Sequence, residues 1–245
     1  MREDSGARRY WGSVMEEAFR FRQRALEHPV EECGEPLVDL PTACEEAGVH
    51  VSFSDAPFPG GHFRIFALRQ GLVEAFLSIA RDLNSMDLVL RLEDCFRTPA
   101  MQKALASAPG IPERVAELVR WETGLDAPPD DVLEKRLSVL VATHVRTAGH
   151  MSGSALDVTV LRMPDGKEVD RGGSYLDLSV ITPMDSPFIG PDAVRNRRVI
   201  SGVLASRGFP AYPWEFWHYS SGDVVAELAS GSGQPARYGP IARDS

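Results

Sequence analysis

The amino-acid sequence predicts a single α+β domain in which a small, mostly antiparallel sheet packs against helices. Apolar residues recur at the helical period of 3.6 from Gln70 to Leu83, which predicts an amphipathic helix. Aliphatic and β-branched runs at Leu88–Leu92 and Ala155–Leu161 are typical of strands, and a Pro-Asp-Gly turn at residues 164–166 predicts a hairpin. With 245 residues, 43% of them hydrophobic, the chain is long enough for one full core.

The N-terminal part is predicted to contain two helices separated by an irregular segment. Residues 10–27 have helical character, with apolar residues among charges, and this helix ends before Pro29. Residues 29–61 contain five prolines and are expected to form loops with short strands such as Val49–Phe53. The second helix, Gln70–Leu83, precedes the strand Leu88–Leu92, which leads the chain to Arg97.

The middle of the chain is expected to form a helical insertion able to cap a cleft. Ala100–Ala106 and Pro112–Trp121 are predicted helices, and the second carries proline in its first turn. Another short helix follows Pro128-Pro129. Farther on, Asp192–Arg207 is a long helix that Gly208 is placed to end with a left-handed cap. Residues 222–245 are rich in glycine, serine and proline, and we expect a partly disordered tail.

Composition narrows the possible partners. The formal net charge of −9 argues against nucleic acid, and Arg195–Arg198, the only basic cluster, is expected to be an exposed or salt-bridged helix face. No apolar run is long enough to span a membrane, and the first residues lack the apolar core of a secretory signal, so we expect a cytoplasmic protein. The three cysteines include no CxxC pair, which argues against a disulfide framework and a cysteine-ligated metal. The oligomeric state stays open.

Two short segments carry the clearest chemical signal. His150–Asp157 and Glu215–His218 together provide two imidazoles and two carboxylates. This is the set that can hold one zinc ion, leave a coordination position for water and place a general base beside it. Each segment alone is a weak signal, because a lone His or Asp is usually structural and the aromatic run Trp214–Tyr219 would more often be core.

Four blocks of sequence resemble a known family. Leu88–Pro99 resembles a strand followed by "DGYRP", and Gly153–Thr159 resembles "GSAIDLT". Gly172–Asp177 is similar to "MGTxFD", and Arg195–Tyr219 is similar to "NRRLL…GF…EWWHY". These blocks, in this order, are those of the D-alanyl-D-alanine dipeptidases, the zinc peptidases of vancomycin-resistance type. The resemblance implies a catalytic domain over residues 61–220 with zinc in a central cleft. Residues 1–60 are then an N-terminal extension packing on the core, and residues 221–245 a C-terminal tail.

The resemblance also implies roles for individual residues. One zinc ion per chain would be held by His150, Asp157 and His218. Glu215 would act as the general base on zinc-bound water, and Arg97 would stabilise the oxyanion. The residues implied to contact the substrate are Asp177, Ser154, Phe96 and Trp217. For Arg97 the alternative is an ordinary ion pair with Glu93 or Asp94, and for Asp177 it is an unremarkable loop carboxylate.

The expected function is therefore a zinc dipeptidase acting on D-Ala-D-Ala or a closely related small dipeptide. Several residues depart from the family pattern beside the predicted catalytic groups: Ala148, Met151, Ser152, Cys95, Phe96, Thr98 and Phe216. These departures remove none of the predicted ligands, the base or Arg97, but they lie where the substrate is expected to bind. The sequence therefore defines the metal chemistry better than the identity of the dipeptide. A related D,D-carboxypeptidase or amidase is one alternative. A metal-binding recognition protein without catalysis is another, although the presence of Glu215 and Arg97 argues against it.

Overall fold

The computed structural model describes residues 2–141 and 144–241, and it confirms the α+β class. The main sheet contains four strands in the order β2 (Val51–Phe53), β4 (Leu88–Asp94), β5 (Ala155–Arg162) and β6 (His218–Ser220). Only β2 and β4 run parallel, so the sheet is mostly antiparallel, as predicted. A second, two-stranded antiparallel sheet pairs β1 (Leu37–Asp39) with β3 (Ala67–Arg69).

The central strand β5 places the most important side chain of the sheet. Its residues from Ala155 to Val160 are all buried, which explains the continuous apolar and β-branched run of its sequence. In the register of the sheet, Asp157 lies opposite Asp94 on β4 and opposite His218 on β6. Residues directly opposite each other in an antiparallel pair lie about 5 Å apart. The strand pairing therefore brings these polar side chains together.

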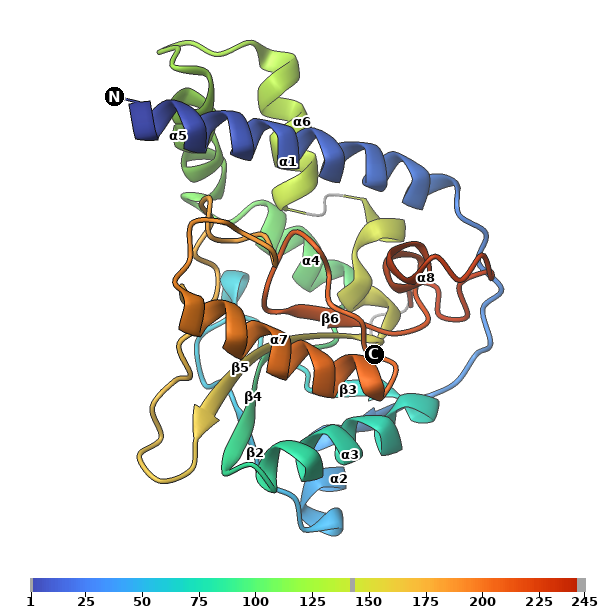
Figure 1. Cartoon of the computed structure of the whole chain (residues 1–245). Helices are drawn as coiled ribbons and strands as arrows, with labels where there is room; N and C mark the ends of the chain where they lie inside the picture. Colours follow the sequence, from blue (N-terminus) through green and yellow to red (C-terminus); the bar gives the residue numbers. More distant parts are fainter. Residues whose placement is uncertain (1, 142–143, 242–245) are drawn as a thin grey trace.

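The main hydrophobic core lies between the sheet and two helices that Figure 1 shows beside it, α3 (Val73–Asn84) and α7 (Pro191–Ser206). The predicted amphipathic helix is confirmed, with a 3₁₀ turn at Gln70–Leu72 in place of its first residues. The predicted end of α7 is also confirmed, because Gly208 adopts a left-handed φ of 85°. The hairpin turn after β5 returns the chain to a single antiparallel bridge between Leu161 and Glu168.

A group of helices from the N-terminal extension and the predicted insertion covers another side of the molecule. Helix α1 (Arg2–Glu27) begins eight residues before the predicted start and packs against α5 (Ile111–Thr123) and α6 (Asp130–Leu140). Figure 1 shows α1 running across α5 and α6, with α4 (Pro99–Ala106) below them. A second apolar cluster holds this group together and includes Trp214 from the C-terminal part.

Two segments differ from their predictions. The proline-rich segment 29–61 contains a helix, α2 (Leu40–Ala47), because Asp39 caps it by accepting from the Thr42 amide and Gly48 ends it with a φ of 64°. The prediction of a disordered tail is wrong for the described residues after Gly222. Helix α8 (Val224–Ser230) forms there, and the chain beyond it is anchored by the buried side chain of Tyr238. Residues 242–245 lie outside the described residues.

Two short 3₁₀ turns precede β5 and complete the framework of the site, η3 (Val145–Thr147) and η4 (Gly149–Ser152). A further turn, η1 (Pro59–Gly61), lies beside α4. Within the described residues, no helix is both long and apolar enough to cross a bilayer.

Candidate metal centre and active site

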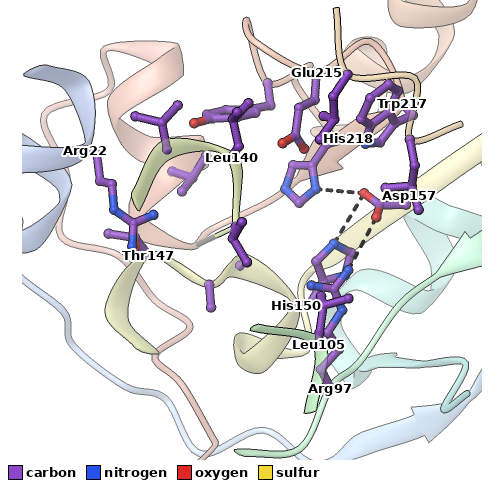
Figure 2. A pocket seen from close by; sticks show the side chains of 18 of the residues that line it. Arg22, Arg97, Leu105, Leu140, Thr147, His150, Asp157, Glu215, Trp217 and His218 are labelled. Atoms are coloured by element: carbon purple, nitrogen blue, oxygen red, sulfur yellow. Dashed lines mark hydrogen bonds and ion pairs between the residues drawn. The ribbon is translucent and has the colours of Figure 1, made fainter. Parts of the chain in front are cut away.

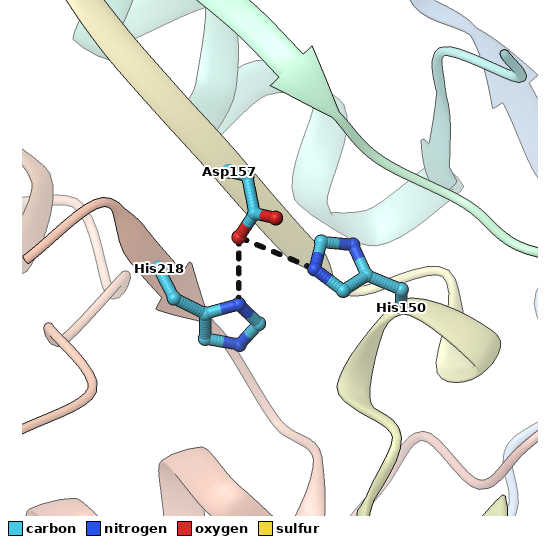
Figure 3. A group of neighbouring side chains, drawn as sticks. All are labelled: His150, Asp157 and His218. Carbon is cyan, nitrogen blue, oxygen red and sulfur yellow. Dashed lines mark hydrogen bonds and ion pairs between the residues drawn. The ribbon is translucent and has the colours of Figure 1, made fainter. Parts of the chain in front are cut away.

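Three side chains predicted to ligate zinc converge at one point. His150 comes from η4, Asp157 from β5 and His218 from β6 (Figure 3). One candidate ligand atom from each lies within 4.8 Å of the others, and all three residues are buried. Sequence separation is large, but the strand register and the turn before β5 place the three groups side by side.

The geometry fits a divalent cation with tetrahedral coordination. Asp157 Oδ1 lies 2.9 Å from His218 Nδ1 and 3.3 Å from His150 Nε2. Ligand atoms of a tetrahedral zinc with bonds of 2.0–2.1 Å lie about 3.4 Å apart. The other nitrogen of His150, Nδ1, lies 2.6 Å from the carbonyl oxygen of Cys95. Donation of Nδ1–H to that carbonyl leaves the Nε2 lone pair facing the site, which is the usual arrangement behind a metal-bound histidine.

Asp157 is held as a charged carboxylate. Burial by itself would raise its pKa, but attraction and hydrogen bonds from His150 and His218 bring the pKa well below its usual value. While Oδ1 faces the two imidazoles, Oδ2 accepts a hydrogen bond of 3.0 Å from the Tyr175 hydroxyl. Burial and the neighbouring Asp157 raise the pKa of Tyr175 well above its usual value, so this hydroxyl remains a donor.

Arg97 is oriented by two neighbours and faces the three candidate ligands His150, Asp157 and His218, which are called the metal cluster below. Its Nε donates to Asp94 Oδ2 over 2.8 Å and its Nη1 donates to Gln102 Oε1 over 3.3 Å. Its Nη2 lies 3.6 Å from Asp157 Oδ2. Burial opposes the charge of Arg97, but Asp94 and Asp157 outweigh it and raise the pKa. The ion pair with Asp94 that the sequence left open is therefore present. Because Arg97 also lines the cavity, the pair fixes its direction toward the site.

Glu215 lies beside the cluster in a tight turn before β6. The amide of His218 donates to the carbonyl of Glu215 over 3.1 Å, and Figure 2 shows both side chains entering the same cavity. Burial, and to a smaller extent the charge of Asp157, raise the pKa of Glu215 to about 7, although His218 and Arg97 act in the opposite direction. A carboxylate with a pKa near 7 can both accept and return a proton at neutral pH.

The cluster opens into a cavity of about 290 Å³. Its inner wall carries Arg97, His150, Asp157, Glu215 and His218. Many of the other lining residues are apolar and come from the helical group described above. These contributions are Phe21 and Ala25 from α1, Leu105 from α4, Ile111 from α5, and Val139 and Leu140 from α6. Helices α1, α4, α5 and α6 thus shield the polar groups from part of the solvent, which strengthens electrostatic interactions between them.

Comparison with known proteins agrees with this geometry. The family model of the M15 peptidases described as D-ala-D-ala dipeptidase matches residues 73–230, well over half of the chain. This segment includes the five polar residues of the cavity, Arg97, His150, Asp157, Glu215 and His218. The chain belongs to this family.

Individual members of the D-Ala-D-Ala dipeptidase family match over shorter stretches. The D-alanyl-D-alanine dipeptidase of Enterococcus faecalis is 27% identical over 110 residues, 41% of this chain and 52% of that protein. The enzyme of the same name from Synechocystis is 33% identical over 87 residues, 31% of this chain and 35% of that protein. The aligned part thus spans about half or less of these relatives. A structure of the LdcB LD-carboxypeptidase matches with a TM-score of 0.38 and 15% identity over 84% of this chain and 76% of that chain, too weakly to support an argument.

The residues predicted from the family pattern to contact substrate lie in different places. Trp217 lines the cavity and packs edge-on against Tyr175, with ring centroids 5.8 Å apart. Ser154 and Phe96 are completely buried and are not among the cavity-lining residues. The Ser154 hydroxyl instead bonds to Ser152 and to Asp223. Their predicted substrate contacts would therefore require a different arrangement of the chain.

Asp177 lies on the loop that follows β5, at the edge of the cavity. Its neighbours Leu176 and Leu178 line the cavity, whereas Asp177 is not among the described lining residues. Leu176 has a φ of 64°, which is rare for a residue other than glycine and is typical of functional segments. Tyr175 connects this loop to the metal cluster through its hydrogen bond to Asp157.

The basic cluster in α7 has a structural role that its sequence pattern did not predict. The expectation of an exposed face is wrong for Arg197, which is 2% exposed. Its guanidinium donates to the carbonyl oxygens of Arg171, Pro183 and Ile181. Arg197 therefore holds both ends of the loop that carries Tyr175 and Leu176. The one signal for this role in the sequence was the position of Arg197 within the segment Arg195–Tyr219 that resembles the family.

Proposed function

We propose that this protein is a zinc-dependent dipeptidase that hydrolyses D-Ala-D-Ala or a closely related small dipeptide. The observation that supports it most is the convergence of His150, Asp157 and His218 beside Glu215 in one cavity. Membership of a family whose described activity is that of a D-ala-D-ala dipeptidase supports the same reaction.

The donor set favours zinc as the metal. Two imidazoles and one carboxylate leave a coordination position free, as in other hydrolytic zinc sites, and none of the three cysteines belongs to the cluster. When bound, zinc supplies a Lewis acid that polarises a carbonyl and lowers the pKa of coordinated water to about 7.

The reaction then depends on two side chains of the chain itself. Glu215 takes a proton from the attacking water and delivers it to the nitrogen of the leaving amino acid as the peptide bond breaks. Arg97 donates to the carbonyl oxygen as negative charge develops there, and its bonds to Asp94 and Gln102 fix its direction beforehand.

The cavity supports a small substrate. A volume of about 290 Å³ lies just below the range of roughly 300–1,000 Å³ found for small-molecule pockets. Helices α1, α5 and α6 contribute to its walls and limit the room for a long peptide or a polymer beside the catalytic groups. The limited volume favours a dipeptidase over a carboxypeptidase that acts on the end of a longer peptide.

The proposal is tested by assaying the purified protein with added zinc against free D-Ala-D-Ala, an amino-blocked form of it and a blocked pentapeptide. Release of alanine from the free dipeptide alone is the expected result. Release of the terminal residue from the blocked pentapeptide would instead indicate a D,D-carboxypeptidase. Stoichiometric zinc without hydrolysis of any peptide or amide in a wider panel would indicate a recognition protein and overturn the proposal.

A further inference from the structure

Helix α1 carries a charged residue at a core position. Its buried stripe is formed by Trp11, Met15, Ala18, Arg22 and Ala25, with spacings of four and three residues. This is the spacing of the face that a helix buries, and an apolar side chain is expected at each position. Arg22 is nevertheless arginine, and only 7% of its surface is exposed.

Arg22 lacks the partner that a buried charge requires. Its Nη2 is buried without a hydrogen-bond partner. Among the residues whose side chains are described, 5–141 and 144–241, no carboxylate forms an ion pair with it. Burial lowers its pKa, and the hydroxyl of Tyr212 acts in the opposite direction. An unpaired buried charge costs stability that an apolar residue of similar size would not cost. Arg22 is thus poorly explained by the fold alone.

The same guanidinium faces the proposed active site. Arg22 lines the cavity that contains Glu215 and the metal cluster, and Figure 2 shows it across that cavity from Asp157. Tyr212 connects the two sides, because its ring centroid lies 5.6 Å from that of His218 and its hydroxyl is close enough to influence Arg22. A substrate lying over the metal cluster would extend toward Arg22.

We propose that Arg22 binds a carboxylate of the substrate. A guanidinium presents donors in a planar fork that matches a carboxylate, and the free Nη2 would gain the partner that the fold does not provide. The inference rests on the proposed function and adds a specificity residue to it. Arg22 lies outside the segment 73–230 that matches the family, so it is a property of this chain's N-terminal helix.

The carboxylate has two possible sources in a dipeptide, its C-terminus or an acidic side chain. We would measure kcat/KM of wild type and Arg22→Met for three substrates: a dialanine, its C-terminal amide, and a dipeptide with one acidic side chain. A terminal carboxylate on Arg22 predicts that amidation lowers kcat/KM of wild type about 10- to 100-fold, the effect of one hydrogen bond to a charged group. If wild type instead prefers the dipeptide with the acidic side chain and amidation has no effect, Arg22 binds the side-chain carboxylate. In both cases Arg22→Met loses the discrimination.

Two further variants make the test specific. Arg22→Lys keeps the charge but not the fork, so it should retain only part of the preference. Arg114→Met removes another arginine of the cavity wall, one that is exposed and paired with Glu117, and it should keep the full preference. Thermal unfolding of each variant establishes that it is folded. Equal discrimination by wild type and Arg22→Met would overturn the inference.

Failure of the proposed function gives a different result. The affinities of the same three peptides are also measured by calorimetry with zinc-loaded Glu215→Gln, with and without Arg22→Met. If no peptide is hydrolysed by wild type but carboxylate-dependent binding disappears with Arg22→Met, only the dipeptidase proposal fails. If peptides are hydrolysed but neither affinity nor kcat/KM depends on residue 22, only the role of Arg22 fails.

Discussion

Replacement of Glu215 by glutamine has two effects of opposite sign that can be measured separately. In the metal-free protein, burial raises the pKa of Glu215 from 4.5 to about 7. The folded state therefore binds a proton between these pH values that the unfolded state has released. Since stability falls with pH wherever the folded state binds more protons, Glu215 is least costly below pH 4.5. It becomes progressively more costly as pH rises through about 7.

The size of this cost follows from the pKa. One pKa unit corresponds to about 1.4 kcal/mol, so a rise from 4.5 to about 7 corresponds to about 3 kcal/mol. Glutamine is uncharged at every pH and does not incur this cost. Relative to wild type, metal-free Glu215→Gln should thus gain up to about 3 kcal/mol in unfolding free energy between pH 5 and pH 8. With zinc, the same variant should keep its metal and lose about 100- to 10,000-fold in kcat, the usual contribution of a general base.

The assay is urea unfolding followed by circular dichroism, at pH 5 and pH 8 with a chelator present. Glu134→Gln, an exposed glutamate of α6, provides the matched control and should show the same stability difference from wild type at both pH values. If the difference between Glu215→Gln and wild type is also independent of pH, Glu215 does not have a raised pKa. Its role as a base would then be supported only by its position beside His218 in the cavity.

Three other substitutions test neighbouring groups. His150→Ala should lower the zinc content well below one per chain, and unchanged metal content would remove His150 from the ligand set. Tyr175→Phe deletes the hydroxyl that donates to Asp157, so zinc affinity measured by competition with a chelating dye should fall about tenfold; an unchanged affinity would show that this bond does not support the ligand. Ala148→Ser adds a hydroxyl to the cavity wall and should alter relative kcat/KM across a dipeptide panel more than zinc affinity. An identical panel profile would exclude residue 148 from substrate selection.

Much of the framework could be predicted because it depends on local patterns. The helix at Val73–Asn84 and the strands around Leu88 and Ala155 follow the periodicity of apolar residues. The helix at Leu40–Ala47 could not be predicted from proline content alone, because proline in a first turn starts a helix as readily as it breaks one elsewhere. The C-terminal segment contains many small residues, yet Ala236 pairs with Val30 and is buried. Tertiary contact with a distant segment thus decides its structure.

The predicted metal ligands and the predicted substrate contacts differ in how firmly sequence places them. Asp157 and His218 are opposite each other in adjacent strands, so their proximity follows once the strands and their pairing are known. Substrate contacts depend on which way loop side chains turn. Ser154 follows a glycine with a φ of 71° and turns into a buried hydroxyl network instead of the cavity. The direction of such a side chain cannot be predicted from the periodicity of apolar residues.

The metal cluster and helix α1 therefore contribute to the cavity in different ways. The wall with the metal cluster comes from the segment that matches the family, and its chemistry can be recognised from short motifs. Part of the opposite wall comes from α1, which precedes that segment and contributes Phe21, Arg22 and Ala25. A substrate must satisfy both walls, but only the first is constrained by hydrolysis itself. Substitutions in α1 should consequently change which peptide is accepted while leaving metal binding intact. Substitutions in the metal cluster should instead weaken metal binding.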